Sequence, residues 1–382
     1  MDTSSECDSP TAIRVGILGT KGIPARYGGF ETFAEELASR WSEDENFRIT
    51  VVCPGPRRPD QAERIGRVRL EYVREPRLGP FTNVAFDLRC LWTHRRSFDI
   101  LYMLGFGAAF ACGVPRLWGT KVWLNMDGLE WKRSKWGGLT RAYVRLMEWV
   151  STWSATRIIA DAEAVKAYFV ETYGDVTCTF IPYGANLLEG AVFSAELLPS
   201  HVRAGAYLLV VARLEPENQI EEIIQGYLRS KLVKPLVIVG GTESASAYVK
   251  RLLRYRSERV KFVGGIYDKP RLAALRCHAH AYFHGHTVGG TNPSLLEALS
   301  AGQPIIAHDN PFNREVAGGI ATFFTDPASI ERILEEGRYL PSSVRDYVAA
   351  CRARLRAKYT WEGVTDRYRD LARMELSSSR VA

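Results

Sequence analysis

The 382-residue sequence lacks the marks of several large protein classes. No apolar run reaches the roughly 20 residues of a membrane-spanning helix, and no segment is of low complexity. The seven cysteines are scattered and include no Cys-x-x-Cys pair, which fits a reducing compartment better than a disulfide framework. The net charge of +7 forms no basic stripe, and no known nucleic-acid motif occurs, so we expect no nucleic-acid partner.

The first residues, MDTSSECDSP, are acidic and polar, which is typical of neither a signal peptide nor a transit peptide. Together with the unpaired cysteines, they predict a cytoplasmic protein with a disordered N-terminus over residues 1–12. The modest positive charge still permits attraction to phosphates, nucleotides or an anionic membrane. The chain is too long for one average core, so we expect two domains.

Apolar runs alternate with helical patterns along the chain, and the series starts again after a looser stretch near residue 204. Continuous apolar runs are typical of parallel strands buried on both faces. We therefore predict an α/β fold of two Rossmann-like, doubly wound domains facing a central cleft. The expected parts are a first domain at 13–185, a linker at 186–204, a second domain at 205–360, and a C-terminal helix at 361–382 that packs back on the first domain.

Residues 283–312 predict a short strand, a glycine-rich turn, a helix and a second strand. Gly289 and Gly290 allow backbone conformations closed to other residues and allow a ligand to approach the main chain. A helix that starts after such a turn presents free N–H groups, which suit a phosphate. The alternative is an ordinary strand–turn–helix unit with a fortuitous glycine pair.

The helix itself has clear start and stop signals. Thr291 or Asn292 can cap it, and Pro293 fits its first turn. Gly302 is expected to end it. Glu297 lies about one turn inside the helix, where it could accept hydrogen bonds from a sugar diol.

Three strand ends of the second domain could converge on the same ligand. Arg213 follows a buried strand and could hold a diphosphate through paired hydrogen bonds, or it could form an ion pair with Glu215 or Glu217. Gly240 and Gly265 each lie in a Gly-Gly pair where a predicted strand ends.

The first domain offers its own candidates. A loop with Gly22, Gly28 and Gly29 joins the first strand to a helix, although the spacing is not that of a dinucleotide fingerprint. It predicts either a phosphate loop or a plain strand-to-helix turn. Asp127 ends the strand at 121–127, where ligands bind in doubly wound sheets, or it caps a turn.

Two further patterns leave alternatives open. Residues 128–157 interleave tryptophans with lysines and arginines, which is typical of a peripheral contact with an anionic membrane and also of a core helix with a solvated basic face. A second cluster raises a zinc site, but its spacing fits no standard zinc motif, and we predict no metal. Its members are Cys277, His278, His280, His284 and His286.

The motifs in the second half resemble a known family. VARLEPEN, the VIVGG and VKFVGG strand ends and GGTNPSLLEALSAGQPIIA are similar to the C-terminal domain of retaining GT-B glycosyltransferases, in particular family 4-like enzymes. GTKGIPARYGGFETFAEEL and NMDGLEWKRSKW look like the bacterial rhamnosyltransferase-like subgroup. The resemblance extends from about Arg14 to Tyr368, nearly the whole chain.

The resemblance implies a metal-independent, retaining hexosyltransferase without a cofactor, with the donor on the second domain and the acceptor on the first. Arg213 matches the diphosphate-binding arginine, and Glu297 matches the second glutamate of an E-x₇-E motif that binds the ribose. Two positions depart from the family. Gly289 stands where the first glutamate belongs, and Asn218 stands where a lysine is usual, which implies altered donor handling or weakened activity.

The resemblance and the residue patterns together give one set of expectations. The donor is expected to be dTDP-rhamnose, and the acceptor a glycan or polyprenyl-linked saccharide of cell-surface polysaccharide assembly. The alternatives are a UDP- or GDP-sugar donor, an epimerase, and a non-catalytic nucleotide-sugar-binding protein. The candidate residues are Asp127 and Glu31 for catalysis; Arg213, Asn218, Gly240, Gly265, Gly290, Thr291, Asn292, Ser294 and Glu297 for the donor; and Gly22, Tyr27, Gly28 and Gly29 for an acceptor or phosphate loop.

Overall fold

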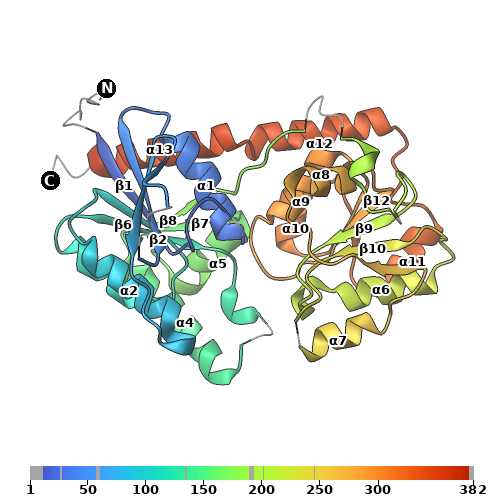
Figure 1. Cartoon of the computed structure of the whole chain (residues 1–382), viewed down its shortest axis with the longest axis horizontal. Coiled ribbons are helices and arrows are strands. Elements are labelled where there is room, and N and C mark those ends of the chain that lie inside the picture. The colour runs from blue at the N-terminus through green and yellow to red at the C-terminus, as the bar shows by residue number, and fades with distance from the viewer. Residues whose placement is uncertain are drawn as a thin grey trace.

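The computed structural model describes residues 12–25, 28–56, 61–133, 136–188, 193–200, 202–244 and 246–377. Two separate sheets lie side by side, each flanked by helices (Figure 1). The predicted α/β class with two doubly wound sheets is confirmed. The expected disorder of the N-terminus and the candidate Tyr27 fall outside the described residues.

The first sheet has eight strands in the order β3-β4-β2-β1-β5-β6-β7-β8. All neighbours pair in parallel except β3 and β4, which form an antiparallel pair. The strands are β1 (Ile13–Leu18), β2 (Phe47–Pro54), β3 (Arg64–Ile65), β4 (Val68–Val73), β5 (Ile100–Leu104), β6 (Lys121–Met126), β7 (Arg157–Ala160) and β8 (Cys178–Phe180). The helices of this half are α1 (Gly29–Trp41), α2 (Thr82–Thr93), α3 (Gly113–Arg116), α4 (Gly138–Ser154) and α5 (Glu163–Tyr173), with short 3₁₀ turns η1 (Gly79–Phe81), η2 (Ala109–Ala111) and η3 (Glu130–Lys132).

The second sheet is wholly parallel, with six strands in the order β11-β10-β9-β12-β13-β14. Its strands are β9 (Leu208–Val211), β10 (Leu236–Val239), β11 (Val260–Phe262), β12 (Ala281–His284), β13 (Ile305–His308) and β14 (Thr322–Phe324). Its helices are α6 (Ile220–Arg229), α7 (Ala247–Leu253), α8 (Lys269–Cys277), α9 (Pro293–Ala301), α10 (Pro311–Ala317) and α11 (Pro327–Glu335), with 3₁₀ turns η4 (Ala195–Leu197) and η5 (Pro216–Asn218).

The strand order places a switch point in each sheet. Strand β1 lies between β2 and β5, and β9 lies between β10 and β12, so the chain runs outward in both directions from these central strands. Ligands of open α/β sheets bind outside the carboxyl ends of the strands at such points. The central strands are buried on both faces, as their unbroken apolar runs predict.

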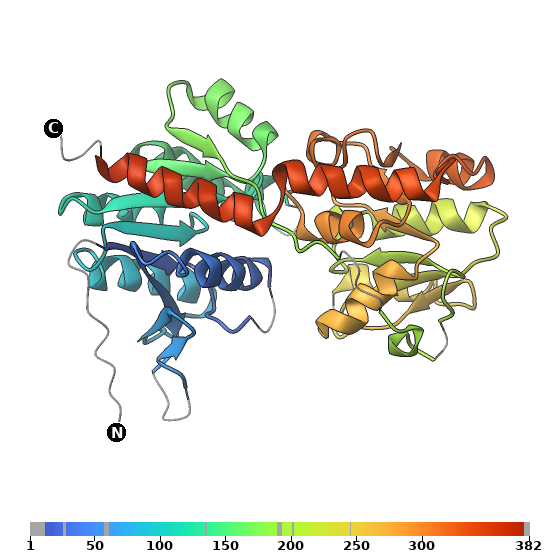
Figure 2. The same ribbon diagram turned by 90° about the horizontal axis from the view of Figure 1, so that it is seen from above.

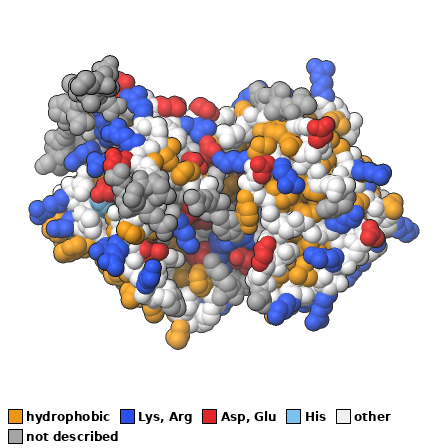
Figure 3. All heavy atoms as spheres, viewed as in Figure 1, with side chains coloured by type: hydrophobic (Ala, Val, Ile, Leu, Met, Phe, Trp, Pro, Cys, Tyr) orange, Lys and Arg blue, Asp and Glu red, His pale blue; other side chains and the backbone are white. Residues whose placement is uncertain are grey.

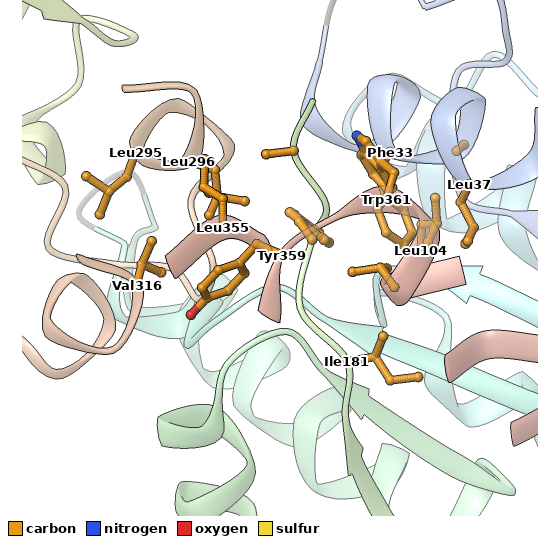
Figure 4. Packing of buried hydrophobic residues seen from close by; sticks show 14 of the residues in the cluster. Phe33, Leu37, Leu104, Ile181, Leu295, Leu296, Val316, Leu355, Tyr359 and Trp361 are labelled. Carbon is orange, nitrogen blue, oxygen red and sulfur yellow. The ribbon is translucent and has the colours of Figure 1, made fainter. Parts of the chain in front are cut away.

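Helices α12 (Val344–Lys358) and α13 (Trp361–Ser377) run one after the other along both halves of the molecule (Figure 2). The first packs on α9 of the second half, and the other packs on α1 of the first half. Figure 4 shows both contacts at once, with Leu355 and Tyr359 facing one group of side chains and Trp361 facing another. The first group is Leu295, Leu296 and Val316, and the second includes Phe33, Leu37 and Leu104.

Polar bonds fix this helical arm to the first sheet and to the interdomain linker. The hydroxyl of Tyr368 on α13 lies 2.8 Å from that of Tyr102, which donates to the side chain of Asn125 at 3.0 Å. Where the chain crosses between the halves, the Ala185 N–H donates to the Tyr359 carbonyl at 2.7 Å. The two crossings between the halves are therefore bonded to each other.

Candidate active site

The two halves touch through glycine-containing loops at the carboxyl ends of their strands. A Cβ atom on Gly128 would lie 2.4 Å from the Cα of Gly289, and one on Gly290 would lie 1.7 Å from Oδ1 of Asp161. The Thr291 hydroxyl donates a very short hydrogen bond to the Asp161 carbonyl. Acidic and basic side chains appear at this junction (Figure 3). The sequence predicted that the glycine pair allows a ligand to approach the main chain. In this structure, Gly128 and Asp161 of the other half lie against these glycines.

The turn and helix that follow β12 are built as the sequence predicted. The Asn292 side chain accepts a hydrogen bond from the Ser294 N–H at 2.9 Å and so caps α9, whose first residue is Pro293. Gly302 ends the helix with φ +71°, in the left-handed region that favours glycine. The N-terminus of α9 thus faces the junction with the first domain.

The loop after β9 carries Arg213, whose side chain is half exposed and lies 3.2 Å from Glu215. The ion pair that the sequence offered as an alternative is therefore present. Asn218 is buried and donates from its amide to the Arg213 carbonyl at 2.7 Å. The structure thus gives Asn218 a positioning role, because its side chain holds the Arg213 loop in place.

Glu297 is half exposed and pairs with the buried guanidinium of Arg276, at 2.5 Å. Arg276 also donates to the Ser294 hydroxyl at 3.4 Å. That hydroxyl lies 2.7 Å from the Tyr282 hydroxyl and donates to the Val211 carbonyl at 3.2 Å. Ser294 therefore joins α9 to the central strand, while Arg276 fixes Glu297 with its carboxylate at the surface.

The two glycines at neighbouring strand ends differ in how tightly they are packed. A Cβ on Gly240 would lie 2.4 Å from the Ala212 carbonyl oxygen, so a larger residue there would press on the main chain next to Arg213. A Cβ on Gly265 would lie 2.7 Å from the Tyr267 hydroxyl, at the far end of an exposed side chain. Of the two, Gly240 is therefore the one that packs against the main chain.

Across the junction, Asp127 and Asp161 follow the adjacent strands β6 and β7. Asp161 is fully buried, and its burial together with the neighbouring Asp127 carboxyl raises its pKa well above the ordinary value. Burial also raises the pKa of Asp127, although the Arg133 guanidinium, 3.8 Å away, opposes the shift. The two carboxyls therefore hold a proton more tightly than isolated carboxyls do.

Guanidinium groups from both halves act on one histidine. Burial, and then the charges of Arg213 and Arg133, lower the pKa of His286 to about 3, so its ring is neutral near pH 7. Its ring stacks on that of His284, with centroids 4.4 Å apart, and His284 is fully buried. Within the described part of the chain, no group of three or more His, Cys, Asp or Glu is placed to hold a metal ion. The zinc interpretation of the histidine cluster therefore gains no support.

Glu31 lies in the first turn of α1, next to the glycine loop, and accepts from the Lys21 N–H at 3.0 Å. A Cβ on Gly28 would lie 1.9 Å from its Oε2, so the carboxylate folds directly against the loop backbone. Gly22 packs in the same way on the Cys53 thiol, 2.9 Å from a Cβ built there, and Gly29 begins α1. The structure therefore gives Glu31 the position of a residue that shapes the loop.

Several residues at the junction were not among the candidates. Asp161 follows β7 as Asp127 follows β6, so the rule that ligands bind at the carboxyl ends of strands could have found it. Arg133 lies in the tryptophan-rich segment, where it was grouped with surface cations. No sequence pattern indicated that Arg276 supports Glu297 or that the charges of Arg213 and Arg133 both lower the pKa of His286, because these interactions join distant segments.

Comparison with known proteins agrees with this geometry. Residues 201–341 match the family of glycosyl transferases group 1, and residues 13–186 match a domain of unknown function, DUF1972. Residues 201–341 are therefore similar to a glycosyltransferase group 1 domain. An uncharacterized glycosyltransferase of Methanocaldococcus jannaschii is 23% identical over 313 residues, which are 73% of this chain and 77% of the relative.

Solved structures of similar shape settle the fold of the whole chain. Sucrose-phosphate synthase of Thermosynechococcus elongatus superposes with a TM-score of 0.76 at 17% identity, over 96% of this chain and 100% of that one. Anabaena HepE in complex with UDP-glucose superposes with a TM-score of 0.67 at 15% identity, over 96% and 100%. The group 1 domain therefore belongs to a chain with the GT-B fold, as the sequence motifs implied.

Proposed function

We propose that the chain is a retaining, metal-independent hexosyltransferase that moves a sugar from a nucleotide-sugar donor to a glycan or polyprenyl-linked acceptor. The observation that carries the proposal is the meeting of two unlike walls. The N-terminus of α9 and Arg213 suit a diphosphate, and they face the carboxyls of Asp127 and Asp161 directly. The group 1 domain match and the UDP-glucose complex of HepE support a nucleotide-sugar donor.

In the proposed reaction, the donor diphosphate lies against Arg213 and the start of α9. These groups stabilise the negative charge that develops on the leaving phosphate. A phosphate oxygen of the donor takes the proton of the attacking hydroxyl, and that hydroxyl enters from the same face as the departing diphosphate, so no protein nucleophile is needed. Asp127 orients the acceptor hydroxyl, since its side chain remains one-third exposed at the junction.

Arg133 is the proposed substitute for the missing lysine. Asn218 stands at the lysine position and is occupied by the Arg213 carbonyl. The charges of Arg133 and Arg213 both act on His286, which indicates that the two guanidinium groups reach the same part of the junction from opposite walls. A donor bound at the junction would then be held by one cation from each half.

The proposed donor is dTDP-rhamnose, and the proposed setting is cell-surface polysaccharide assembly in the cytoplasm. Both rest on the resemblance of the N-terminal motifs to rhamnosyltransferase-like enzymes. The competing proposals are a UDP- or GDP-sugar donor, and a protein that binds a nucleotide sugar without turnover. The latter is favoured by the two departures at Gly289 and Asn218.

The test is the change in melting temperature caused by dTDP, UDP, GDP and ADP, because a ligand of the native state stabilises it by mass action. We expect dTDP to give the largest rise in melting temperature. In Arg213→Gln, we expect the apparent affinity for dTDP to fall at least about tenfold, because a bidentate phosphate contact is lost. A larger rise with UDP or GDP would exclude dTDP-rhamnose. No rise with any nucleotide would overturn the nucleotide-sugar site.

Turnover separates an enzyme from a binding protein. With the preferred nucleotide sugar and a polyprenyl-linked acceptor, we expect release of the nucleoside diphosphate that depends on the acceptor. Release without acceptor, together with an altered sugar, would instead identify an epimerase. Tight binding without release against a pool of acceptors would establish the non-catalytic alternative.

A further inference from the structure

Helix α4 exposes a row of large apolar side chains. Leu139, Leu146, Trp149 and Trp153 are 92%, 49%, 51% and 55% exposed, and their spacing of three, four and seven residues places them on one face. The opposite face, which includes Met147, packs on the protein core. Three turns of a helix that present leucine and tryptophan to water need a partner to cover them.

The row continues on the neighbouring elements. Arg116, at the end of α3, donates to the Trp153 carbonyl at 2.7 Å and so joins α3 to α4. Arg95 lies over the rings of Trp92 and Trp118, at 4.8 and 5.5 Å from their centroids. We call this surface the aromatic face; its exposed members are Trp92, Phe110, Leu117, Trp118, Leu139, Leu146, Trp149 and Trp153.

The segments that carry the aromatic face have exposed charges of one sign, although exposed Asp175 lies beside Arg116 and Trp153 at one end of the face. Exposed arginines stand among the aromatic residues, at positions 89, 96, 116, 141 and 145. Over residues 81–97, 109–119 and 138–154, the only acidic residues are Asp87 and Glu148, and neither is exposed. Glu148 is buried and accepts hydrogen bonds from two tyrosine hydroxyls, while burial raises the pKa of Asp87 to about 7. These segments therefore present positive charge with no exposed carboxylate to balance it.

The aromatic face adjoins the candidate active site. Helix α4 begins soon after η3, which itself follows Asp127. The Arg145 guanidinium of α4 lies 5.2 Å from the ring centroid of Trp131 in η3 and links the two segments. In Figure 1, α2 and α4 lie along the lower edge of the first half, and Figure 3 shows hydrophobic and basic side chains along that edge.

We propose that the aromatic face docks the chain on an anionic phospholipid bilayer. Tryptophan rings favour the region of the lipid headgroups, where an apolar ring meets water, and arginines among them bind lipid phosphates while their stems lie on apolar surface. The centre of a protein–protein interface is usually poor in charge. Here Arg95 and Arg96 lie over the Trp118 ring within the aromatic face, which favours the lipid. Among the described residues no helix could span a membrane, so the contact is peripheral.

Sedimentation of the full chain with lipid vesicles tests the proposal. One set of vesicles contains phosphatidylcholine alone, and the other contains equal parts of phosphatidylcholine and phosphatidylglycerol. We expect binding to the mixed vesicles that is at least about tenfold tighter than to phosphatidylcholine, because each arginine near an anionic surface adds attraction. High salt should weaken it by screening. Equal binding to both sets, or binding to neither, would overturn the proposal.

Paired variants distinguish the face from the rest of the surface. Trp149→Ser with Trp153→Ser is expected to abolish binding to the mixed vesicles. Val233→Ser with Val344→Ser is the matched control, since both side chains lie on the second half and are 88% and 69% exposed. The control should bind as the unaltered chain does. Equal loss in both pairs, or no loss in either, would overturn the assignment to this face.

Further variants test the contribution of the arginines and the alternative that a second copy of the chain covers the aromatic face. Arg96→Gln with Arg141→Gln should weaken vesicle binding, whereas Arg256→Gln with Arg345→Gln on the second half should not. Light scattering gives the oligomeric state without lipid. A dimer that the tryptophan pair dissolves would show that another chain covers the face, and would overturn the membrane assignment. None of these variants lies at the junction of the halves, so each should keep the melting-temperature response to nucleotide. Failure of the membrane proposal would leave that response intact and can therefore be told apart from failure of the proposed function.

Discussion

The two walls of the junction are built from the same strand–turn–helix unit but carry opposite chemistry. On the second half, Arg213 presents a positive charge, and the capped start of α9 presents the positive end of a helix dipole. On the first half, Asp127 and Asp161 follow neighbouring strands and present carboxyls. One fold thus yields a wall suited to a diphosphate and a wall suited to a hydroxyl.

The difference shows how the local backbone decides what each wall can do. On the second half, glycine at 289 and 290 keeps the backbone bare, so that other groups can approach it. On the first half, β6 and β7 each place an acidic side chain at the same edge of the sheet. The bare backbone and the acids are in contact in this structure, so the proposed donor would bind between walls that stand further apart.

Asp127→Asn is expected to have the largest effect among the variants that test the different roles of the two walls. The change keeps the shape of the side chain but removes the carboxylate proposed to orient the acceptor hydroxyl. We expect turnover to fall about a thousandfold, within the range for loss of a catalytic carboxyl. The melting-temperature response to nucleotide should remain, because it belongs to the opposite wall. If nucleotide binding were lost and turnover of the residual complex kept, the two walls would have been assigned the wrong way round.

Gly290→Ala tests whether the walls must touch. Its Cβ would lie 1.7 Å from Oδ1 of Asp161, so the halves cannot close as they do here. A displacement of this size is expected to lower turnover about a hundredfold. Because the clash is with one side chain, Asp161→Ala in the same chain should relieve it.

The double variant is the control for this prediction. We expect Gly290→Ala with Asp161→Ala to be more active than Gly290→Ala alone, and the difference measures the coupling between the two positions. Strictly additive losses in a double-mutant cycle would show that the alanine acts on the turn itself and not on the contact between the halves.

The fold could be predicted largely from the sequence because its signals are local. Unbroken apolar runs identify buried parallel strands, and Asn292, Pro293 and Gly302 mark a helix start and end within one segment. The apolar runs also placed Asp127 and Arg213 just after strands, where the structure has them. In each case, the residue and the structure that it determines lie within a few positions of each other.

The contacts that shape the site could not be predicted in this way. The amide of Asn218 bonds to the Arg213 carbonyl, and the carboxylate of Glu31 accepts from the Lys21 N–H. The partners of Asp161 come from the other half of the chain, 130 residues away in the case of Thr291. No periodicity or spacing encodes such a contact, since it depends on how two finished domains meet.

Asp161→Asn should give the smallest effect, seen as a change in how stability depends on pH. The folded pKa of Asp161 is raised, so its folded form holds the proton more tightly than the unfolded chain does. The stability that it contributes is full below the unfolded pKa, about 3.9, and is lost as pH rises through the folded value. Melting temperatures of the variant and the unaltered chain should therefore diverge with rising pH, in favour of the variant, by on the order of a few degrees.

Two comparisons sharpen this measurement. His286, whose pKa is lowered to about 3, has the opposite dependence, because its contribution is lost as pH falls below about 6.5. It is present in both chains and cancels in the difference. Asp87→Asn, at a buried carboxyl in α2 with a pKa of about 7, is the matched control away from the junction. Nucleotide bound between the walls should reduce the pH-dependent difference in melting temperature between Asp161→Asn and the unaltered chain. The corresponding difference for Asp87→Asn should stay unchanged. Parallel pH curves for Asp161→Asn and the unaltered chain would show that Asp161 is charged in the closed junction.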